Sequence, residues 1–259
     1  MKRFTDVTKE ELTDLCKNQL LSPREIAKIY GVSHVSIRRW IKRHGIDAYY
    51  PDLINKEREK YFTKELYEFL IGSLLGDGCI EVNGSKKAGR FEVSHSIKQK
   101  EYLMWKKETL GDLVTCFREG VATIKEKTYG VCMFKSLSHP RFLYFRELFY
   151  IDGVKSIDER ISEFLTPYAV AIWFQDDGSL HKSSKTLRIS TDCFSYADHL
   201  KLQKMMNDKY GILLRIEKTY KKENQYCFGA DRKNSKLLSK LIEPHVIESM
   251  KYKLINEKV

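Results

Sequence analysis

Hydrophobic residues in the first part of the chain recur at the three- and four-residue spacing of helices. One such stretch begins at Thr8, and a second covers residues 23–30. The second stretch follows Ser22, with proline at the first helical position and Glu25 three residues after the serine, which is the arrangement of a capping box. Both segments are therefore predicted to be short helices.

A third helix is predicted between Ser33, which suits the N-cap, and about His44. Gly31 precedes this helix and suits the left-handed residue of a tight turn, while Gly45 ends it. The inward face of the helix is expected to hold Val35, Ile37, Trp40 and Ile41. A short helix, a glycine turn and a longer helix predict a small all-α helix-turn-helix domain in residues 1–45.

The third helix is strongly basic, because it carries four arginines and lysines and no acidic residue. A solvated face on a small bundle is one explanation of this charge, and contact with DNA is the explanation we favour. Polar and basic side chains of such a helix reach base edges, and the basic side chains near its end meet phosphates. The expected DNA-binding residues here are Ser33, His34, Ser36, Arg38, Arg39, Lys42 and Arg43.

Residues 46–62 contain Pro51 and the charged run 56–60, and we interpret them as a partly helical linker. Beyond the linker, helices alternate with pairs of strands. Helices are predicted at 64–76, 99–110, 140–149, 167–176, 195–210 and 234–242, and strands at 79–82, 90–97, 115–127, 129–136, near 180, and at 186–192, 212–220 and 225–230. This order indicates an α+β fold with antiparallel sheets.

The region 63–259 contains an internal duplication. The sequence EKTY at 126–129 recurs at 217–220, the pattern FEVS at 91–94 recurs as LRIS at 187–190, and Asp77-Gly78 recurs as Asp177-Gly178. The offsets are 91, 96 and 100 residues, and three collinear matches are much stronger evidence of duplication than one. Two related halves are therefore predicted, at about 63–158 and 159–259.

The most informative repeat is an apolar nonamer that ends in aspartate and glycine, LIGSLLGDG at 70–78 and VAIWFQDDG at 170–178. Both segments are apolar on nearly every side, so both are expected to be buried helices. The Gly72-x-x-x-Gly76 spacing lets another backbone approach closely, and packing of the two helices would bring Asp77 and Asp177 together. Adjacent carboxylates repel unless a divalent cation lies between them, and an oxygen-rich site favours Mg²⁺.

The alternative interpretation is that each Asp-Gly pair only ends a helix. Because the pair occurs at equivalent positions of both halves of a basic protein, we favour the metal site. Mg²⁺ held in this way is used in phosphodiester hydrolysis, where it activates water and stabilises the leaving oxygen.

The composition narrows the classes of protein that fit. The 259 residues include 46 lysines and arginines against 35 acids, for a net charge of +11 and a pI near 9.2, which favours a polyanionic partner. A mean hydropathy of −0.45 and the lack of a long apolar run exclude a membrane span, and without a secretory signal we expect an intracellular protein. The cysteines and histidines lack the spacing of zinc ligands.

The two nonamers resemble the signature of the LAGLIDADG homing endonucleases, and the duplication resembles that of the single-chain members, over about residues 64–254. The second half, in which LTP at 165–167 leads into the motif, is similar to the branch of the yeast mitochondrial omega-intron endonuclease. The resemblance implies that Asp77 and Asp177 are catalytic and bind the metal. Gly76 and Asp176, which precede them, are included in the expected metal site.

The same resemblance implies one basic residue near each scissile phosphate. Spacing from the motifs places these residues at Lys155 and Lys253. A lysine there would orient or deprotonate the attacking water, or offset charge in the transition state. An ordinary surface lysine is the alternative for each, because the chain has 46 cations.

The antiparallel sheets are expected to form a saddle for DNA. Alternation along the strands places Phe91, Val93, Leu187 and Ile189 inward. The outward side chains, expected to read base edges, are Arg90, Glu92, Ser94, Ser96, Arg188, Ser190 and Asp192. The loop residues expected to contact phosphates are Lys86, Lys87, Lys182, Lys185, Lys221, Lys222 and Arg232.

The expected function is site-specific, Mg²⁺-dependent cleavage of duplex DNA by a monomer with internal pseudo-twofold symmetry. The alternative is a non-catalytic nucleic-acid binder of the same fold, either a transcription regulator or a maturase that binds intron RNA. A recombinase or transposase is suggested only by the helix-turn-helix, since the sequence has neither a third collinear acid nor an evident nucleophilic serine or tyrosine.

Overall fold

The computed structural model describes residues 7–19, 21–46, 57–84, 86–124, 126–219 and 224–255. The chain divides into two compact units, Met1–Tyr61 and Phe62–Val259. Each unit has a hydrophobic core of its own.

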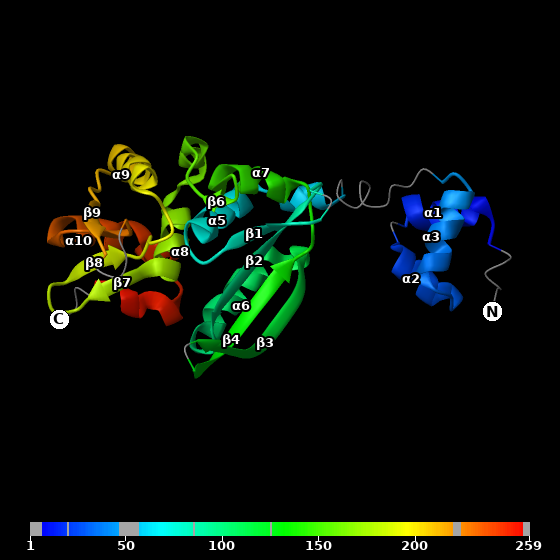
Figure 1. Ribbon diagram of the computed structural model, residues 1–259, viewed down its shortest axis with the longest axis horizontal. Helices are drawn as coiled ribbons and strands as arrows, with labels where there is room; N and C mark the ends of the chain where they lie inside the picture. The colour runs from blue at the N-terminus through cyan, green and yellow to red at the C-terminus, as the bar shows by residue number, and fades with distance from the viewer. Residues whose placement is uncertain are drawn as a thin grey trace. The chain divides into compact units, whose positions relative to one another are not determined.

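In residues 7–46, as far as the structure describes them, the N-terminal unit contains the helices α1 (Lys9–Lys17), α2 (Pro23–Tyr30) and α3 (His34–Arg43) (Figure 1). A backbone N–H three residues ahead donates to the side chain of each cap, Thr8, Ser22 and Ser33. Gly31 ends α2 in the left-handed conformation at φ 64°, where any side chain would be strained. The three predicted helices and the glycine turn are confirmed.

The core of this unit uses the predicted inward residues of α3 with one exception. Ile37 is fully buried, and Trp40 and Ile41 pack against the same cluster. Val35 is 44% exposed, so the expectation that it points inward is wrong. Two residues along a helix rotate the side chain through roughly 200°, and Val35 therefore cannot share a face with Ile37.

The two end residues of the predicted linker, Ile46 and Phe62, each pack into one of the units. Ile46 is only 6% exposed and belongs to the core of the N-terminal unit. Phe62, at the other end, stacks on His139 and packs edge-on against Phe142 in the second unit. Glu59–Tyr61 form a short 3-10 helix, whereas residues 47–56 lie outside the described part of the chain.

The two halves of the second unit repeat one order of elements: helix, two strands, helix, two strands, helix. The first half contains α5 (Lys64–Leu75), β1 (Cys79–Val82), β2 (Gly89–Ser96), α6 (Lys100–Leu110), β3 (Val114–Ile124), β4 (Lys127–Ser136) and α7 (Arg141–Phe149). The second half contains α8 (Pro167–Asp177), β7 (Gly178–His181), β8 (Thr186–Ile189), α9 (Tyr196–Tyr210), β9 (Arg215–Lys218), β10 (Tyr226–Gly229) and α10 (Arg232–Ile242). The predicted elements of this region are confirmed, with ends that differ by at most three residues.

Several short elements were not predicted, because strands of two residues and single helical turns leave no hydrophobic period to detect. A small hairpin, β5 (Tyr150–Ile151) and β6 (Val154–Lys155), follows α7. The 3-10 helices are η3 (Ile97–Gln99), η4 (Gly111–Leu113), η5 (Glu159–Phe164), η6 (Glu243–His245) and η7 (Glu248–Lys253).

Each half contributes one four-stranded antiparallel sheet, with the strand orders β1-β2-β4-β3 and β7-β8-β10-β9. Helices α6 and α7 pack on the first sheet, and α9 and α10 pack on the second. Helices α5 and α8 pack against each other between the two sheets (Figure 1). Among the described residues, none of the helices has both the length and the apolar character that a membrane crossing requires.

Two glycines allow the close approach of α5 to α8. A Cβ atom on Gly72 would lie 2.4 Å from the carbonyl oxygen of Ala169, and a Cβ atom on Gly76 would lie 2.5 Å from the Cβ atom of Asp176. Both distances are far shorter than van der Waals contact. The contact predicted from the Gly72-x-x-x-Gly76 spacing is therefore confirmed, and it sets the position of the two motif aspartates.

Candidate active site

The packing of α5 on α8 brings the two motif aspartates to the same end of the helix pair. Asp77 follows Gly76, the C-cap of α5, and Asp177 is the last residue of α8. Burial, followed by the charge of Asp77, raises the pKa of Asp177, and a carboxylate acts on the pKa of another in this way only at short range.

Both aspartates hold a proton more tightly than an ordinary aspartate does. Burial, followed by the charge of Asp176, raises the pKa of Asp77 to about 6, although 42% of its side chain is exposed. Burial, followed by the charges of Asp77 and Asp176, raises the pKa of Asp177 to about 8. Lys155 and Lys253 oppose both of these pKa shifts without cancelling them. The site therefore favours an additional positive charge.

Two lysines hold equivalent positions beside the aspartates. The Lys155 Nζ donates to the carbonyl oxygen of Gly76 at 3.0 Å. The Lys253 Nζ donates to the carbonyl oxygens of Gln175 and Asp176 at 2.6 and 3.1 Å. Gly76 and Asp176 are the residues before the motif aspartates, so each lysine contacts the same backbone position of its motif. Lys253 is only 8% exposed, and burial lowers its pKa.

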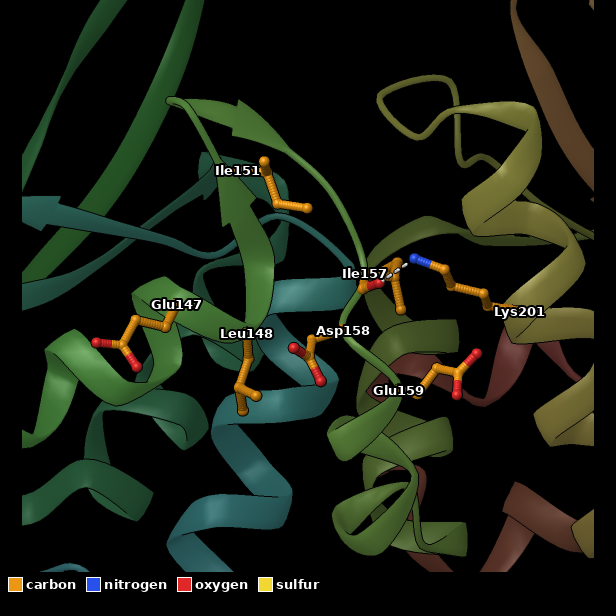
Figure 2. Close-up of a pocket in the computed structure, with 7 residues that line it drawn as sticks. All are labelled: Glu147, Leu148, Ile151, Ile157, Asp158, Glu159 and Lys201. Atoms are coloured by element: carbon orange, nitrogen blue, oxygen red, sulfur yellow. Dashed lines mark hydrogen bonds between the residues drawn. The ribbon is translucent and has the colours of Figure 1, made fainter.

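The segment that follows Lys155 is fastened to the second half of the unit. In Figure 2 the side chain of Lys201, from α9, points to the carbonyl oxygen of Ile157, to which it donates at 2.6 Å. Asp198, on the same helix, accepts from the Ile157 backbone N–H at 3.0 Å and from the Ser156 hydroxyl at 3.1 Å. These hydrogen bonds restrict the β6 end of the hairpin and so the position of Lys155.

A pocket of about 360 Å³ lies beside this segment (Figure 2). Its walls carry both charges and apolar side chains: Glu147, Leu148, Ile151, Ile157, Asp158, Glu159 and Lys201. The motif aspartates and their lysines do not line it. The pocket is therefore a feature of the junction between the halves and is separate from the candidate active site.

The side chain of Asp176 is bound within the protein. The Lys106 Nζ, from α6, donates to both carboxylate oxygens at 2.6 and 2.8 Å, and the Tyr102 hydroxyl donates to Oδ1 at 2.8 Å. The three side chains are buried. The backbone N–H of Asp77 donates to Oδ2 of Asp176 at 3.2 Å. Asp176 therefore joins α6 of the first half to α8 of the second half and restrains the backbone of Asp77.

These hydrogen bonds compete with the expected role of Asp176 in holding the metal through its side chain. A cation at this carboxylate would compete with Lys106, and a buried ammonium without its partner is strongly unfavourable. Gly76 and Asp176 each present a backbone carbonyl oxygen beside the motif aspartates. Each carbonyl oxygen has two lone pairs, and the lysine hydrogen bond uses one of them.

His95 is a further residue of the site, and no sequence motif singles it out. It points inward from β2, its side chain is 2% exposed, and its Nδ1 lies 3.3 Å from Oδ2 of Asp77. Burial, followed by the charge of Lys106, lowers the pKa of His95 to about 4. One atom each from Asp77, His95 and Asp176 could ligate a metal, and these atoms lie within 4.8 Å of one another.

The outward face of the first sheet is arranged as alternation predicted. Ser94 and Ser96 are exposed on β2. Arg90 forms ion pairs with Glu81 and with Glu92, and Glu92 also pairs with Lys135 at 2.8 Å. These charged side chains lie on the neighbouring strands β1, β2 and β4. The surface therefore carries both positively charged hydrogen-bond donors and negatively charged acceptors.

The outward face of the second sheet is less heavily paired. Arg188 is exposed on β8, and its Nε and Nη2 lie 3.1 and 2.8 Å from the sulfur of Cys227. Ser190 and Asp192 are exposed, but both lie beyond the end of β8 at Ile189.

The structure places only some of the expected basic loop residues on loops. Exposed positions on the β1–β2 and β7–β8 hairpin loops are occupied by Lys86, Lys87, Lys182 and Lys185. Lys221 and Lys222 lie outside the described residues. Arg232 is exposed but is the first residue of α10, so its placement on a loop was wrong. Asp231 caps this helix by accepting from the Asn234 backbone N–H, which starts the helix two residues earlier than predicted.

In the N-terminal unit, the basic side chains of α3 are open to solvent. Arg38, Arg39, Lys42 and Arg43 are exposed or half-exposed, as are His34 and Ser36. Ser33 is exposed, and its hydroxyl caps the helix by accepting from the Ser36 backbone N–H at 3.1 Å.

Comparison with known proteins identifies the family. Residues 67–238 match the LAGLIDADG DNA endonuclease family. The chain is 30% identical over 211 residues to the cytochrome b mRNA maturase bI2 of Debaryomyces hansenii, covering 79% of this chain and 78% of that protein. It is 26% identical over 207 residues to the DNA endonuclease I-ChuI of Chlamydomonas applanata, covering 74% of this chain and 95% of that protein.

A solved structure has the same fold. The homing endonuclease I-WcaI, bound to its DNA recognition sequence, matches with a TM-score of 0.70 at 22% identity, over 78% of this chain and 92% of that one. The chain therefore belongs to the LAGLIDADG DNA endonuclease family, and the resemblance drawn from the two nonamers is confirmed. Several other curated relatives are longer, and the chain spans 47% of their length.

The raised pKa of Asp177 generates a prediction about stability. Between its ordinary value of 3.8 and about 8, the folded chain keeps a proton that the unfolded chain has lost, so the free energy of unfolding falls as the pH rises through this window. In Asp177→Asn this loss is absent. Without divalent cations at pH 8.5, we expect the variant to melt at least about 2 °C above the wild type, since 1 kcal/mol shifts Tm by about 2–4 °C in a domain of this size.

Thermal unfolding measured from pH 5 to pH 9 in EDTA checks this expectation, and the gap between variant and wild type should narrow toward pH 5. Asp192→Asn, which changes an exposed carboxylate, is the control and should show no such trend. A variant that is less stable than the wild type at pH 8.5 would contradict the assigned pKa shift.

Proposed function

We propose that this protein is a site-specific homing endonuclease that hydrolyses one phosphodiester in each strand of duplex DNA, using a divalent metal ion, most simply Mg²⁺. The observation that carries the proposal is the paired arrangement of two motif aspartates and two lysines. Each lysine donates a hydrogen bond to the backbone carbonyl oxygen of the residue before an aspartate. One chain supplies both half-sites, so the proposed active form is a monomer.

The residues present suit a divalent cation of the Mg²⁺ type. The side chains that would hold it are the carboxylates of Asp77 and Asp177, with the carbonyl oxygens of Gly76 and Asp176 beside them, and hard cations prefer such oxygen ligands. The raised pKa values of both aspartates support this assignment, because burial and then the neighbouring carboxylates raise them and the site's own lysines do not cancel the shift. A bound cation would supply Lewis acidity toward water and the leaving oxygen.

Lys155 and Lys253 are proposed to act on the reacting groups at each half-site. Each is held by a backbone carbonyl next to a motif aspartate, within reach of a phosphate placed there. An ammonium in this position orients the attacking water and offsets the negative charge that develops on the phosphate oxygens. The lowered pKa of Lys253 also suits it to accept a proton.

Duplex DNA is the proposed partner of the two sheets. The outward side chains of β2 and β8 are of the types that read base edges, and exposed lysines on both hairpin loops suit phosphate contacts. The fold match to an endonuclease bound to its recognition sequence supports this placement. The N-terminal unit is proposed to act as a helix-turn-helix, with the basic residues of α3 on the DNA.

The likeness to a cytochrome b mRNA maturase supports a second candidate function, in which the protein binds intron RNA. A maturase or a transcription regulator of this fold would not require both motif aspartates for its activity. The loss of DNA cleavage on removing either carboxylate therefore separates the endonuclease proposal from these alternatives.

Asp77→Asn and Asp177→Asn should each abolish double-strand cleavage while specific DNA binding persists, because the change removes a charge and little surface. We expect a loss of at least about a hundredfold in the cleavage rate at saturating enzyme. The measurement is a cleavage assay on a library of targets drawn from the DNA that flanks the gene, with and without Mg²⁺. Wild-type cleavage of both strands by either variant would show that the active site is assigned wrongly.

Deleting residues 1–50 removes ten cations and six acids, a net loss of four positive charges. If these cations meet phosphates, the dependence of log K on log salt should become shallower by about 0.9 for each phosphate that the truncated protein no longer neutralises. The truncated protein should still cleave at higher concentration and tolerate changes at one end of its target. Arg38→Ala should relax the same end, at a cost of about 1–3 kcal/mol if its hydrogen bonding to guanine is bidentate. A footprint of unchanged length would rule out this role.

A further inference from the structure

The environment of His95 differs from that of every other residue in the candidate site. Its imidazole is almost fully buried, and its Nε2 has no hydrogen-bond partner within the described structure. On one side Nδ1 lies 3.3 Å from Oδ2 of Asp77, and on the other side Nε2 lies 3.8 Å from Oδ1 of Asp176. A negative carboxylate beside Nε2 favours the neutral tautomer with the ring proton on Nε2, which leaves the lone pair on Nδ1, the nitrogen next to Asp77.

Only one of the two neighbouring carboxylates has ligand capacity to spare. Each oxygen of Asp176 already accepts two hydrogen bonds, Oδ1 from Lys106 and Tyr102 and Oδ2 from Lys106 and the backbone N–H of Asp77. Asp77 has no such cation bonded to it in the described structure, and its side chain is 42% exposed, so an ion can reach it from solvent. Two atoms 3.3 Å apart can both lie about 2.1 Å from a single cation, which is the length of a metal–nitrogen or metal–oxygen bond.

We propose that His95 is a metal ligand: its Nδ1 and Oδ2 of Asp77 together form a mixed nitrogen and oxygen site in the first half, which prefers a divalent transition-metal ion over Mg²⁺. Imidazole binds transition metals well, whereas Mg²⁺ is held almost entirely by oxygen. This inference rests on the proposed function only in taking Asp77 as a metal-binding residue.

The second half offers no imidazole at the matching place. The alignment of FEVS with LRIS sets Ser94 opposite Ser190, and therefore His95 opposite Thr191. Thr191 is fully buried, and its hydroxyl bonds to Nε2 of His199 at 2.7 Å. The selectivity for a transition metal therefore belongs to the half-site of Asp77 alone, and the two half-sites differ in metal preference.

The test uses the full chain and Mn²⁺ as the probe, in the absence of DNA. Pulsed electron paramagnetic resonance of bound Mn²⁺ should show the coupling of a directly ligated imidazole nitrogen. Titration should show that Mn²⁺ binds the first half-site at least about tenfold more tightly than Mg²⁺. In His95→Gln both the nitrogen coupling and the preference for Mn²⁺ should be lost, with Mg²⁺ affinity changed by less than about twofold. His181→Gln, which changes an exposed histidine of β7, should keep both signals.

The wild-type spectrum is decisive even if His95→Gln fails to fold. Mn²⁺ that is bound in an Asp77-dependent manner but shows no nitrogen coupling would overturn the role of His95 and leave the proposed endonuclease site intact. Mn²⁺ binding that Asp77→Asn leaves unchanged would overturn both, because Asp77 would then hold no metal.

Discussion

The close packing of α5 on α8 is the constraint on which the rest of the second unit depends. Gly72 and Gly76 allow the two backbones to approach, and the space that a side chain would need is filled by Ala169 and Asp176 of the other helix. Because Asp77 follows the C-cap of α5 and Asp177 is the last residue of α8, this packing fixes where the two carboxylates lie. Their pKa values are raised as a result, so the helix pair sets the electrostatics of the site as well as its geometry.

The site combines a repeated framework with an asymmetric interior. Lys155 and Lys253 approach equivalent carbonyl groups, although one ends a β-hairpin and the other ends a 3-10 helix. The residue before the aspartate is glycine in one half and a buried aspartate in the other, and Asp176 can occupy its position only because Gly76 has no side chain. Asp176, held in place by its ion pair with Lys106, then stiffens the first half-site by accepting a hydrogen bond from the backbone N–H of Asp77.

Much of this arrangement could be predicted from the sequence, because it follows from patterns that repeat. The nonamers, the duplication and the alternation of β2 and β8 led to the two helices, the two sheets and the convergence of Asp77 with Asp177. The residues that the sequence did not reveal are single polar residues within otherwise apolar patterns. Lys106 lies four residues after Tyr102 on the inward face of α6, and His95 lies at an inward position of β2. A charged or titratable residue on an apolar face is a signal that a buried partner exists, but the sequence does not identify that partner. The partner here, Asp176, is 70 residues from Lys106, and only the packing of the two halves joins them.

In the proposed mechanism each lysine serves one strand, because each belongs to one half-site. The most direct measurement is the analysis of strand-specific products from a supercoiled target and from end-labelled duplex, with Lys155→Met and Lys253→Met compared with the wild type. Methionine keeps most of the aliphatic chain and removes the cation. We expect each variant to accumulate nicked DNA, with the uncut strand differing between the two variants and the cleavage rate of that strand reduced by about tenfold or more. Loss of cleavage at the same strand in both variants, or equal loss at both strands in each, would contradict the division of the site into two halves.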